Sequence, residues 1–365
     1  MGGVWMDGKP AELAAAIERA AEILSMARLP VVAGLGSDVA GTRAAILLAE
    51  KLRGAYDHIH ARRIFADLDV VRQAGLMITT PNEARLRADV YLFVGRDLSK
   101  IWPALITRLA PGEIPPFDLV QEPRKILWVA PGRGGGKIEG STVQTIEFGD
   151  VHVTLASLRA RVGGHAVNAP KTMLHKLDDA AETLKQARFG VAIWGGDELD
   201  SLAVETLYGL IVDLNKTTRF TGLPLGSGAN ASGVVQTSGW MTGFPVRTAF
   251  GRGFPEHDTW RFDSTRLIES GEADAALWIN AYGAESPPWK KIVPLVALAQ
   301  KQASFARSPQ VLIEIGQPGK DHDAAEYSLE TTSIVGRFAE EKSELPSAAD
   351  IIGEISKQIE GNAAC

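Results

Sequence analysis

The feature of this sequence that most constrains its fold is the alternation of short apolar segments with longer segments of helical periodicity. Short segments that are almost wholly apolar are typical of strands buried on both faces, because helices cover both sides of a parallel sheet. Helical segments between such strands predict βαβ units. The sequence therefore predicts the α/β fold class, with Rossmann-like, mainly parallel sheets. The predicted strands are 31–34, 90–94, 125–129, 190–194, 275–280 and 311–315.

Four segments show the periodicity of amphipathic helices. In the first, from about residue 10 to residue 28, Leu13, Ile17 and Leu24 recur near one face. Pro10 favours its first turn, and Pro30 ends it before the first predicted strand. The other predicted helices are 202–214, 290–303 and 348–359.

The length and composition predict a globular protein with two lobes. A chain of 365 residues exceeds the size of about 250–300 residues at which one hydrophobic core usually stops growing. Hydrophobic residues make up 45% and charged residues 22% of the chain, which excludes disordered and fibrous classes. The stretch 162–170, rich in Gly, Asn and Pro, is the predicted hinge.

Charge and hydropathy exclude two classes of partner. The net charge is −6 and the basic residues are scattered singly, so we expect no nucleic-acid partner. The apolar runs 210–212 and 275–279 are far shorter than the roughly 20 residues of a membrane helix, so we expect no membrane partner. Residues 1–8 lack the basic and apolar regions of a signal peptide, which predicts a cytoplasmic protein.

Cysteine and histidine usage limits the metal chemistry. The single cysteine, Cys365, is the last residue and can form neither a cysteine zinc site nor an iron–sulfur cluster. His58 and His60 stand two residues apart, so a strand would place both on one face, where they could bind zinc or copper. No third ligand stands nearby, and packed or solvated histidines explain the same pattern.

Glycine-rich segments give the most informative signals. The segment 34–41 follows a strand and opens a helix, but such a turn needs glycine with or without a ligand. Loops that follow later strands gather at the ligand-binding edge of an α/β sheet, where backbone amides can bind the phosphates of a large anionic ligand. A glycine-rich connection without a ligand remains an equal alternative. The candidate residues are Gly195, Gly196, Asp197, Gly226, Gly228, Asn230 and Gly233.

Taken in this order, these segments resemble the molybdopterin- or tungstopterin-binding B subunit of formylmethanofuran dehydrogenase, a member of the molybdopterin oxidoreductase superfamily. The resemblance implies a discontinuous α/β lobe, 1–57 plus 188–365, with 58–187 inserted as a second α/β lobe. It also makes the seven candidate residues a vestigial pterin cleft. The segments that carry it are 11–28, 34–41, 87–95, 194–196, 226–233, 242–245 and 273–279.

The departures from this family imply that the cofactors have been lost. The family opens with an iron–sulfur segment and ends with a β-barrel domain that covers the pterin, and we expect this chain to lack both. The family's metal-ligating thiolate should fall near 61–67, where the sequence reads Ala-Arg-Arg-Ile-Phe-Ala-Asp. An arginine stays protonated and cannot ligate a metal. We therefore expect no metal, no cofactor and no catalytic residue.

The same losses are typical of the B subunits of formyltransferase/hydrolase complexes in methylotrophic bacteria. This second resemblance implies a scaffold role beside the A, C and D subunits. Such a complex moves a formyl group from a tetrahydromethanopterin-type carrier to a methanofuran-type carrier and releases formate. The hydrolytic metal would belong to the A subunit and the transferase site to the D subunit, so that this chain meets the methanofuran-type carrier at most indirectly.

Two alternatives stay open. The first is an active pterin oxidoreductase in which His58 or His60 replaces the thiolate. The second is a binding module that holds a nucleotide or the polyglutamyl tail of the carrier on the 226–233 tract. Basic residues that could serve such a tail are Arg62, Arg63, Arg247 and Arg252.

Overall fold

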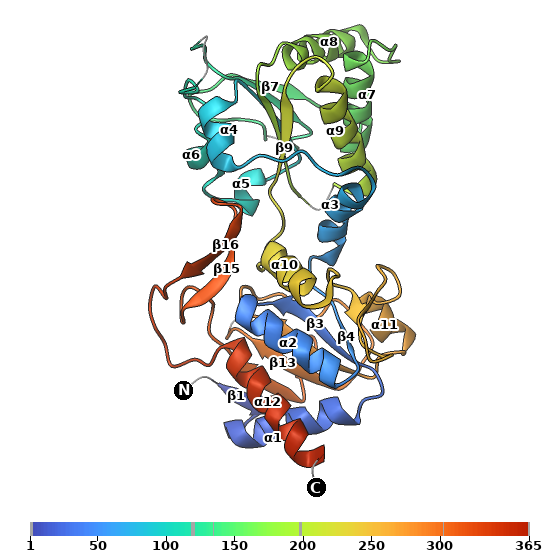
Figure 1. Ribbon diagram of the computed structural model, residues 1–365, viewed down its shortest axis with the longest axis vertical. Coiled ribbons are helices and arrows are strands. Elements are labelled where there is room, and N and C mark those ends of the chain that lie inside the picture. Colours follow the sequence, from blue (N-terminus) through green and yellow to red (C-terminus); the bar gives the residue numbers. More distant parts are fainter. Residues whose placement is uncertain (1–2, 118–120, 134, 197–198, 302, 364–365) are drawn as a thin grey trace. The chain divides into compact units, whose positions relative to one another are not determined.

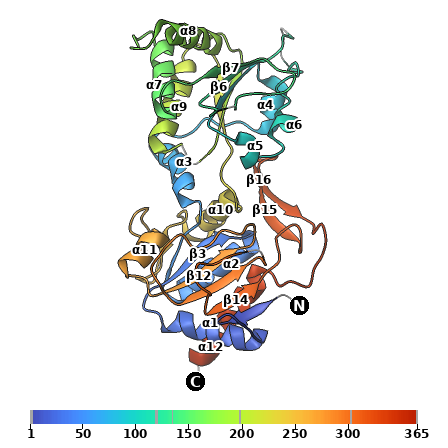
Figure 2. The same cartoon turned by 180° about the vertical axis from the view of Figure 1, so that it is seen from behind.

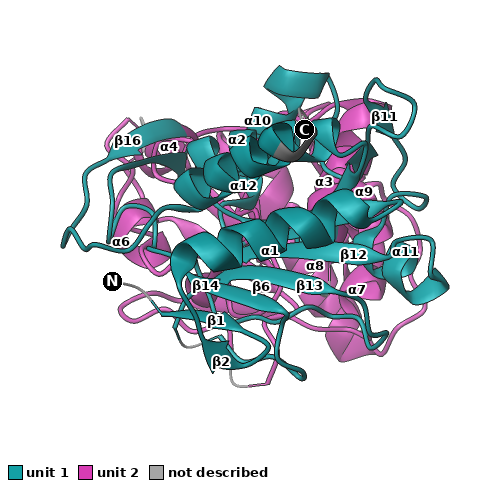
Figure 3. Cartoon of the chain, turned by 90° about the horizontal axis from the view of Figure 1, so that it is seen from below, with its two compact units in different colours: residues 1–61, 228–327, 334–365 teal, residues 62–227, 328–333 magenta. Residues whose placement is uncertain are grey.

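A computed structural model describes residues 3–117, 121–133, 135–196, 199–301 and 303–363 of the chain. The chain divides into two compact units, which Figure 3 shows in different colours. Unit 1 comprises Met1–Ala61, Gly228–Tyr327 and Ile334–Cys365, and unit 2 comprises Arg62–Ser227 and Ser328–Ser333.

Unit 1 is built on a nine-stranded sheet. Its strands, in the order in which they lie side by side, are β11 (Glu256–His257), β10 (Thr248–Ala249), β4 (Ala55–Tyr56), β3 (Pro30–Gly36), β12 (Ala275–Asn280), β13 (Leu295–Ala299), β14 (Val311–Glu314), β1 (Val4–Met6) and β2 (Lys9–Pro10). The five strands from β4 to β14 are parallel, and the two strands at each edge are antiparallel.

Three helices cover one face of this sheet: α1 (Leu13–Met26), α2 (Val39–Lys51) and α12 (Ala348–Ala363). They contact one another in the order α1, α12, α2, as Figure 1 shows. On the other face α11 (Ser264–Ser270) packs Leu267 and Ile268 against Ala33 and Trp278 of the strands. The remaining helix of unit 1, α10 (Ala231–Thr242), packs on α2.

Unit 2 is built on a five-stranded sheet in which every strand is parallel to its neighbours. In spatial order the strands are β7 (Val143–Ile146), β6 (Lys125–Val129), β5 (Val90–Val94), β8 (Gly190–Trp194) and β9 (Phe220–Pro224). The helices are α3 (Ala61–Ala74), α4 (Pro81–Arg87), α5 (Leu98–Ile101), α6 (Leu105–Leu109), α7 (Val151–Val162), α8 (Lys171–Lys185) and α9 (Ser201–Leu214).

The central strand β5 shows why this sheet is apolar throughout. Successive side chains of a strand point to opposite faces, so Leu92 packs in one core and Phe93 in the other. The first core takes residues from α3, α7, α8 and α9, and the second takes residues from α4, α5 and α6. Helices therefore cover both faces of the sheet of unit 2.

A two-stranded sheet of β15 (Ala324–Ser328) and β16 (Ser333–Arg337) precedes α12. The turn of this hairpin, Ser328–Ser333, is grouped with unit 2. Among the described residues, no helix has both the length and the apolar character needed to cross a membrane.

Three expectations from the sequence differ from the structure. The helix predicted at 290–303 is wrong, because Leu295–Ala299 pairs with β12 and β14 as strand β13. The stretch 162–170 is not a hinge between lobes, since it joins α7 to α8 inside unit 2. The segment 188–227 belongs to unit 2, whereas the predicted boundary at 187/188 gave it to the other lobe, because β8 pairs with β5 and β9 pairs with β8.

Candidate functional site

The candidate cleft residues are divided between the two units. Gly195, Gly196 and Gly226 belong to unit 2, while Gly228, Asn230 and Gly233 belong to unit 1. Asp197 lies outside the described residues, and so does Cys365.

In unit 1, Asn230 lies at the start of α10 in the left-handed conformation. Its Nδ2 donates a hydrogen bond to the carbonyl oxygen of Ser37 at 2.8 Å, and its Oδ1 accepts one from the Tyr327 amide at 2.9 Å. Ser37 follows β3, and Tyr327 lies in β15. The amide of Asn230 therefore joins three segments of unit 1, and both ends of this amide are engaged within the chain.

At the carboxyl end of β12, Asn280 is buried and similarly engaged. Its Oδ1 accepts hydrogen bonds from the amides of Tyr282 and Gly283, both at 3.2 Å. Its Nδ2 donates to Glu285 Oε2 at 2.9 Å. These bonds close the loop after β12 onto the end of its own strand.

Tyr282 extends this network to the β15–β16 hairpin. Its hydroxyl donates to Glu326 Oε2 at 2.8 Å, and Glu326 Oε1 pairs with Arg337 Nε at 2.6 Å. Burial, reinforced by the negative charge of Glu326, raises the pKa of the Tyr282 hydroxyl. Tyr282 therefore stays protonated and acts as a hydrogen-bond donor.

Several glycines of these loops lie against atoms of the chain itself. A Cβ atom at Gly36 would lie 2.8 Å from Asn280 Oδ1, and one at Gly195 would lie 2.8 Å from Ile101 Cδ1. At Gly233 it would collide with the Asn230 side chain. Gly196 and Gly226 adopt positive φ angles of 108° and 70°, which side chains disfavour. Internal packing or backbone conformation thus accounts for glycine at these five positions.

Gly228 differs from these glycines. It is exposed, and a Cβ atom there would meet His60 Nε2 at an ordinary contact distance of 3.5 Å. Packing therefore does not require glycine at this position.

The two histidines lie after β4, with ring centroids 5.6 Å apart. His58 is buried, and its Nδ1 accepts a hydrogen bond from the His60 amide at 3.0 Å. The other ring nitrogen, Nε2, must then carry the proton and donate to the Ala229 carbonyl at 3.1 Å. Burial lowers the pKa of His58 to about 3. With both nitrogens engaged, the neutral ring of His58 has no lone pair for a metal.

The carboxylate beside His58 is buried as well. Asp57 accepts hydrogen bonds from the His58 amide and from the amide and hydroxyl of Ser264, and lies 3.4 Å from Arg247 Nε. Burial raises its pKa to about 6, although Arg247 and the backbone donors act in the opposite direction. Within the described ranges, no three His, Cys, Asp or Glu residues are grouped so that they could hold a metal ion.

The segment 61–67, where the family's thiolate is expected, forms the beginning of α3, and its residues 62–67 belong to unit 2. Arg63 is buried, and its Nη2 pairs with Asp67 Oδ1 at 2.7 Å. The same carboxylate oxygen accepts a hydrogen bond from Trp194 Nε1 at 2.9 Å. The Asp67 carboxylate thus joins α3 to the end of β8 and also pairs with Arg63 of the same helix, and this segment contains no soft donor.

The arginines proposed for a carrier tail have other contacts. Arg247 pairs with Asp57 and Asp263, and Arg252 pairs with Glu256 at 3.0 Å. Arg62 is exposed, whereas Arg63 is held by Asp67. Of these four arginines, Arg247 and Arg252 belong to unit 1, and both serve internal ion pairs.

The sequence prediction missed the Asn280–Glu285 and Trp194–Asp67 hydrogen bonds. A polar residue that ends an apolar strand, as Asn280 does, could have indicated the first of these bonds. The pairing of Trp194 with Asp67 spans 127 residues and leaves no local pattern.

Comparison with known proteins identifies the family. No family model matches the chain. Over 357 residues the chain is 33% identical to the B subunit of the formyltransferase/hydrolase complex Fhc of Methylorubrum extorquens, and the alignment covers 97% of this chain and 96% of the relative. This chain belongs to the family of B subunits of formyltransferase/hydrolase complexes. The predicted resemblance is thereby confirmed.

Structural comparison agrees with the sequence. The chain matches a chain in the crystal structure of the FhcABCD complex from Methylorubrum extorquens in complex with methylofuran. The TM-score is 0.88 at 34% identity, and the match covers 99% of this chain and 100% of the other. The predicted α/β fold class is therefore confirmed.

More distant relatives come from redox enzymes. The B subunit of the tungsten-containing formylmethanofuran dehydrogenase 2 of Methanococcus maripaludis is 22% identical over 351 residues, which are 90% of this chain and 79% of the relative. The corresponding subunit of Methanocaldococcus jannaschii is 23% identical over 354 residues, with the same two coverages.

Proposed function

We propose that this chain is a structural subunit of a formyltransferase/hydrolase complex and carries no catalytic residue. The complex transfers a formyl group from a tetrahydromethanopterin-type carrier to a methanofuran-type carrier and releases formate. The partners are the A, C and D subunits, and the complex works in the cytoplasm. Support comes from the relative that was crystallised as part of FhcABCD.

The observation that carries the proposal is the engagement of polar groups where the redox relatives would bind a pterin. The side-chain amides of Asn230 and Asn280 form hydrogen bonds with other parts of unit 1. At 61–67 the buried Arg63, paired with Asp67, stands where the redox family would have a thiolate. Molybdenum and tungsten need a donor with a free lone pair, which a guanidinium lacks. These residues do not fit a metal-bound pterin, so no redox step is assigned to them.

The test is metal content measured together with activity. The chain is co-expressed with the A, C and D subunits, the complex is purified, and molybdenum, tungsten and iron are measured by mass spectrometry. We expect formate release from a formylated carrier, with no molybdenum or tungsten in proportion to this chain. One such atom per copy, with formate-dependent dye reduction, would instead establish the pterin oxidoreductase.

A matched substitution sharpens this test. The doubly substituted complex His58→Gln, His60→Gln should release formate at the wild-type rate once its assembly has been verified, because neither ring binds metal or substrate. Loss of dye reduction in this variant alone would support the alternative in which a histidine replaces the thiolate.

The carrier-tail alternative has less support, since Arg63 and Arg247 are held by carboxylates of the chain. Thermal-shift titration of the chain with a methanofuran-type carrier or a guanine nucleotide should leave its melting temperature unchanged. A shift that saturates with concentration would favour a binding module.

A further inference from the structure

Among the described residues, one face of the sheet of unit 1 carries a single helix, α11, which packs against β3 and β12. The strand order runs from β3 to β4 in one direction and from β12 to β14 in the other. Right-handed crossovers therefore place α2 on one face and the connections β12–β13 and β13–β14 on the opposite face. Those connections, 281–294 and 300–310, contain no helix in their described residues. Figure 2 shows this face, with α11 at its β4 side.

Such a face is unusual for parallel strands, which are normally buried on both sides by crossover helices. Side chains on the two faces of β14 differ in burial. Val311 and Ile313 point toward α1 and are fully buried, whereas Leu312 points to the opposite face and is only partly buried. From the β13–β14 connection, Phe305 packs against the core on this face.

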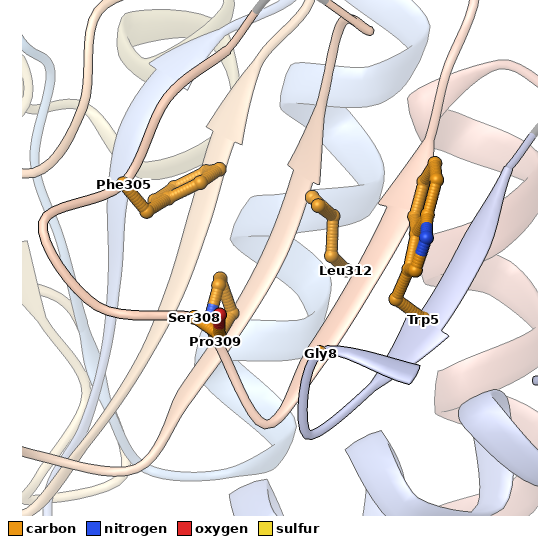
Figure 4. Close-up of a pocket in the computed structure, with 6 residues that line it drawn as sticks. All are labelled: Trp5, Gly8, Phe305, Ser308, Pro309 and Leu312. Carbon is orange, nitrogen blue, oxygen red and sulfur yellow. The ribbon is translucent and has the colours of Figure 1, made fainter. Parts of the chain in front are cut away.

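The open part of the face forms an apolar groove. Trp5 stands directly opposite Leu312 in the antiparallel β1–β14 pair, so both side chains lie on the same face. Figure 4 shows the Phe305 ring on the other side of Leu312. The groove has a volume of about 210 Å³ and is lined by Trp5, Gly8, Phe305, Ser308, Pro309 and Leu312. We call it the β14 groove.

The segment that contains the β12–β13 and β13–β14 connections is rich in basic residues. Residues 286–313 contain four basic residues and no Asp or Glu, in a chain whose net charge is −6. These four residues, Lys290, Lys291, Lys301 and Arg307, are exposed. Arg307 directly precedes Ser308 of the groove, whereas Lys290 and Lys291 lie by α11, where the Lys290 amide donates to Glu269 Oε1 at 2.6 Å. Within the part of the chain that the structure describes, none of these four residues forms an ion pair. Lys9 adds a positive charge beside Gly8, and Asp7 adds one negative charge.

We propose that the β14 groove is the docking site for a neighbouring subunit of the complex. The occupant is an acidic segment of the A, C or D subunit that inserts one large apolar side chain between Trp5 and Phe305. Its carboxylates lie beside Lys9 and Arg307. The inference rests on the proposed function for the existence of these partners. Its physical basis is that buried apolar anchors in pockets supply most of the affinity of an interface, whereas charges at the rim speed association.

The experiment compares leucine substitutions in the full chain. Leu312→Ser places a hydroxyl in the groove, while Leu202→Ser makes the same change at an exposed position of α9 in unit 2. Each purified chain is titrated against the immobilised A, C and D subunits. We expect Leu312→Ser to weaken binding roughly tenfold or more and Leu202→Ser to change it less than about twofold. Circular dichroism and the melting temperature establish that each variant is folded.

A second variant tests the charge complementarity. Lys9→Glu with Arg307→Glu should slow association several-fold at low salt, and the difference from the wild type should shrink as salt is added. Folded Leu312→Ser and double charge-reversal chains that both bind with wild-type affinity and rate would overturn the groove proposal alone. A wild-type chain that binds none of the three subunits would overturn the proposed function and the groove proposal together.

Discussion

The two sheets of this chain differ in how their faces are covered. The five-stranded sheet of unit 2 has helices on both faces and two closed cores. The nine-stranded sheet of unit 1 has helices along one face, whereas the other carries α11 and two connections whose described residues form no helix. A parallel sheet with an incompletely covered face gains from a further layer. Unit 2 is therefore closed by its own helices, whereas unit 1 has the incompletely covered face on which we propose that a partner docks.

The largest expected effect tests this contrast directly. Phe93 is fully buried in unit 2, with its ring centroid 5.1 Å from that of Trp128. Phe93→Ala should lower the free energy of unfolding by about 3–5 kcal/mol, because the closed core cannot collapse around the cavity. Leu312→Ala in the β14 groove should cost the isolated chain less than about 1 kcal/mol, since solvent already reaches that side chain. Urea unfolding measures the free energy of unfolding of both variants. Equal losses would contradict the difference in coverage between the two sheets.

The next effect concerns the internal ion pair of unit 2. Asp67→Asn leaves the guanidinium of Arg63 buried without an opposite charge and should cost roughly 3 kcal/mol. The double variant Asp67→Asn, Arg63→Met should recover much of this loss, because it removes the uncompensated charge. Urea unfolding of the wild type and both variants measures these changes in the free energy of unfolding. A double variant no more stable than Asp67→Asn would show that the pair does not act as a unit.

A smaller effect tests the carboxyl edge of the sheet in unit 1, where packing explains the glycine at 233. Gly233→Ala should destabilise the chain by about 1–3 kcal/mol, since its methyl group displaces the amide of Asn230 from Ser37 and Tyr327. Gly239 lies in the same helix with nothing within 4 Å of a Cβ atom. Gly239→Ala should therefore be neutral or stabilise by up to about 1 kcal/mol. Thermal unfolding that ranks the two variants the other way would refute the packing explanation.

The sequence predicted the strands that are wholly apolar and clearly bounded. The runs 90–94, 125–129, 190–194 and 275–280 coincide with β5, β6, β8 and β12. The sequence failed at β13, because the apolar residues 292–299 fit helical and strand periodicity equally well. Only pairing with β12 and β14 decides between the two, and no local pattern records such pairing. The two-residue strands β4, β10 and β11 are too short to show a period.

For the candidate site, the sequence located the glycine-rich loops but not the groups that they contact. Gly195 and Gly196 follow β8 as predicted, and Gly226 comes two residues after β9. The partners of Asn230 are 193 and 97 residues away in the chain, so tertiary folding alone brings them together. Whether these loops are a vestige of a pterin cleft stays a prediction.

The smallest expected effect concerns pH and the consecutive buried residues Asp57 and His58. Burial lowers the pKa of His58 to about 3, against an ordinary value of 6.5. Between these values the unfolded chain binds the additional proton, so the contribution of His58 to stability is complete above pH 6.5 and is lost as the pH falls. The slope is at most about 1.4 kcal/mol per pH unit. For Asp57 the sign is opposite, because burial raises its pKa from 3.8 to about 6.

The contribution of Asp57 is therefore complete below pH 3.8 and is lost as the pH rises through about 6. From about pH 4 to 6 the two slopes oppose each other, and the pair adds little net pH dependence to the wild-type chain. His58→Gln removes one slope, so the stability of this variant relative to the wild type should fall as the pH rises through that window. Urea unfolding at several pH values measures the difference. If the free energy of unfolding varied with pH in the same way in both proteins, His58 would titrate normally and would not be kept neutral by its burial in unit 1.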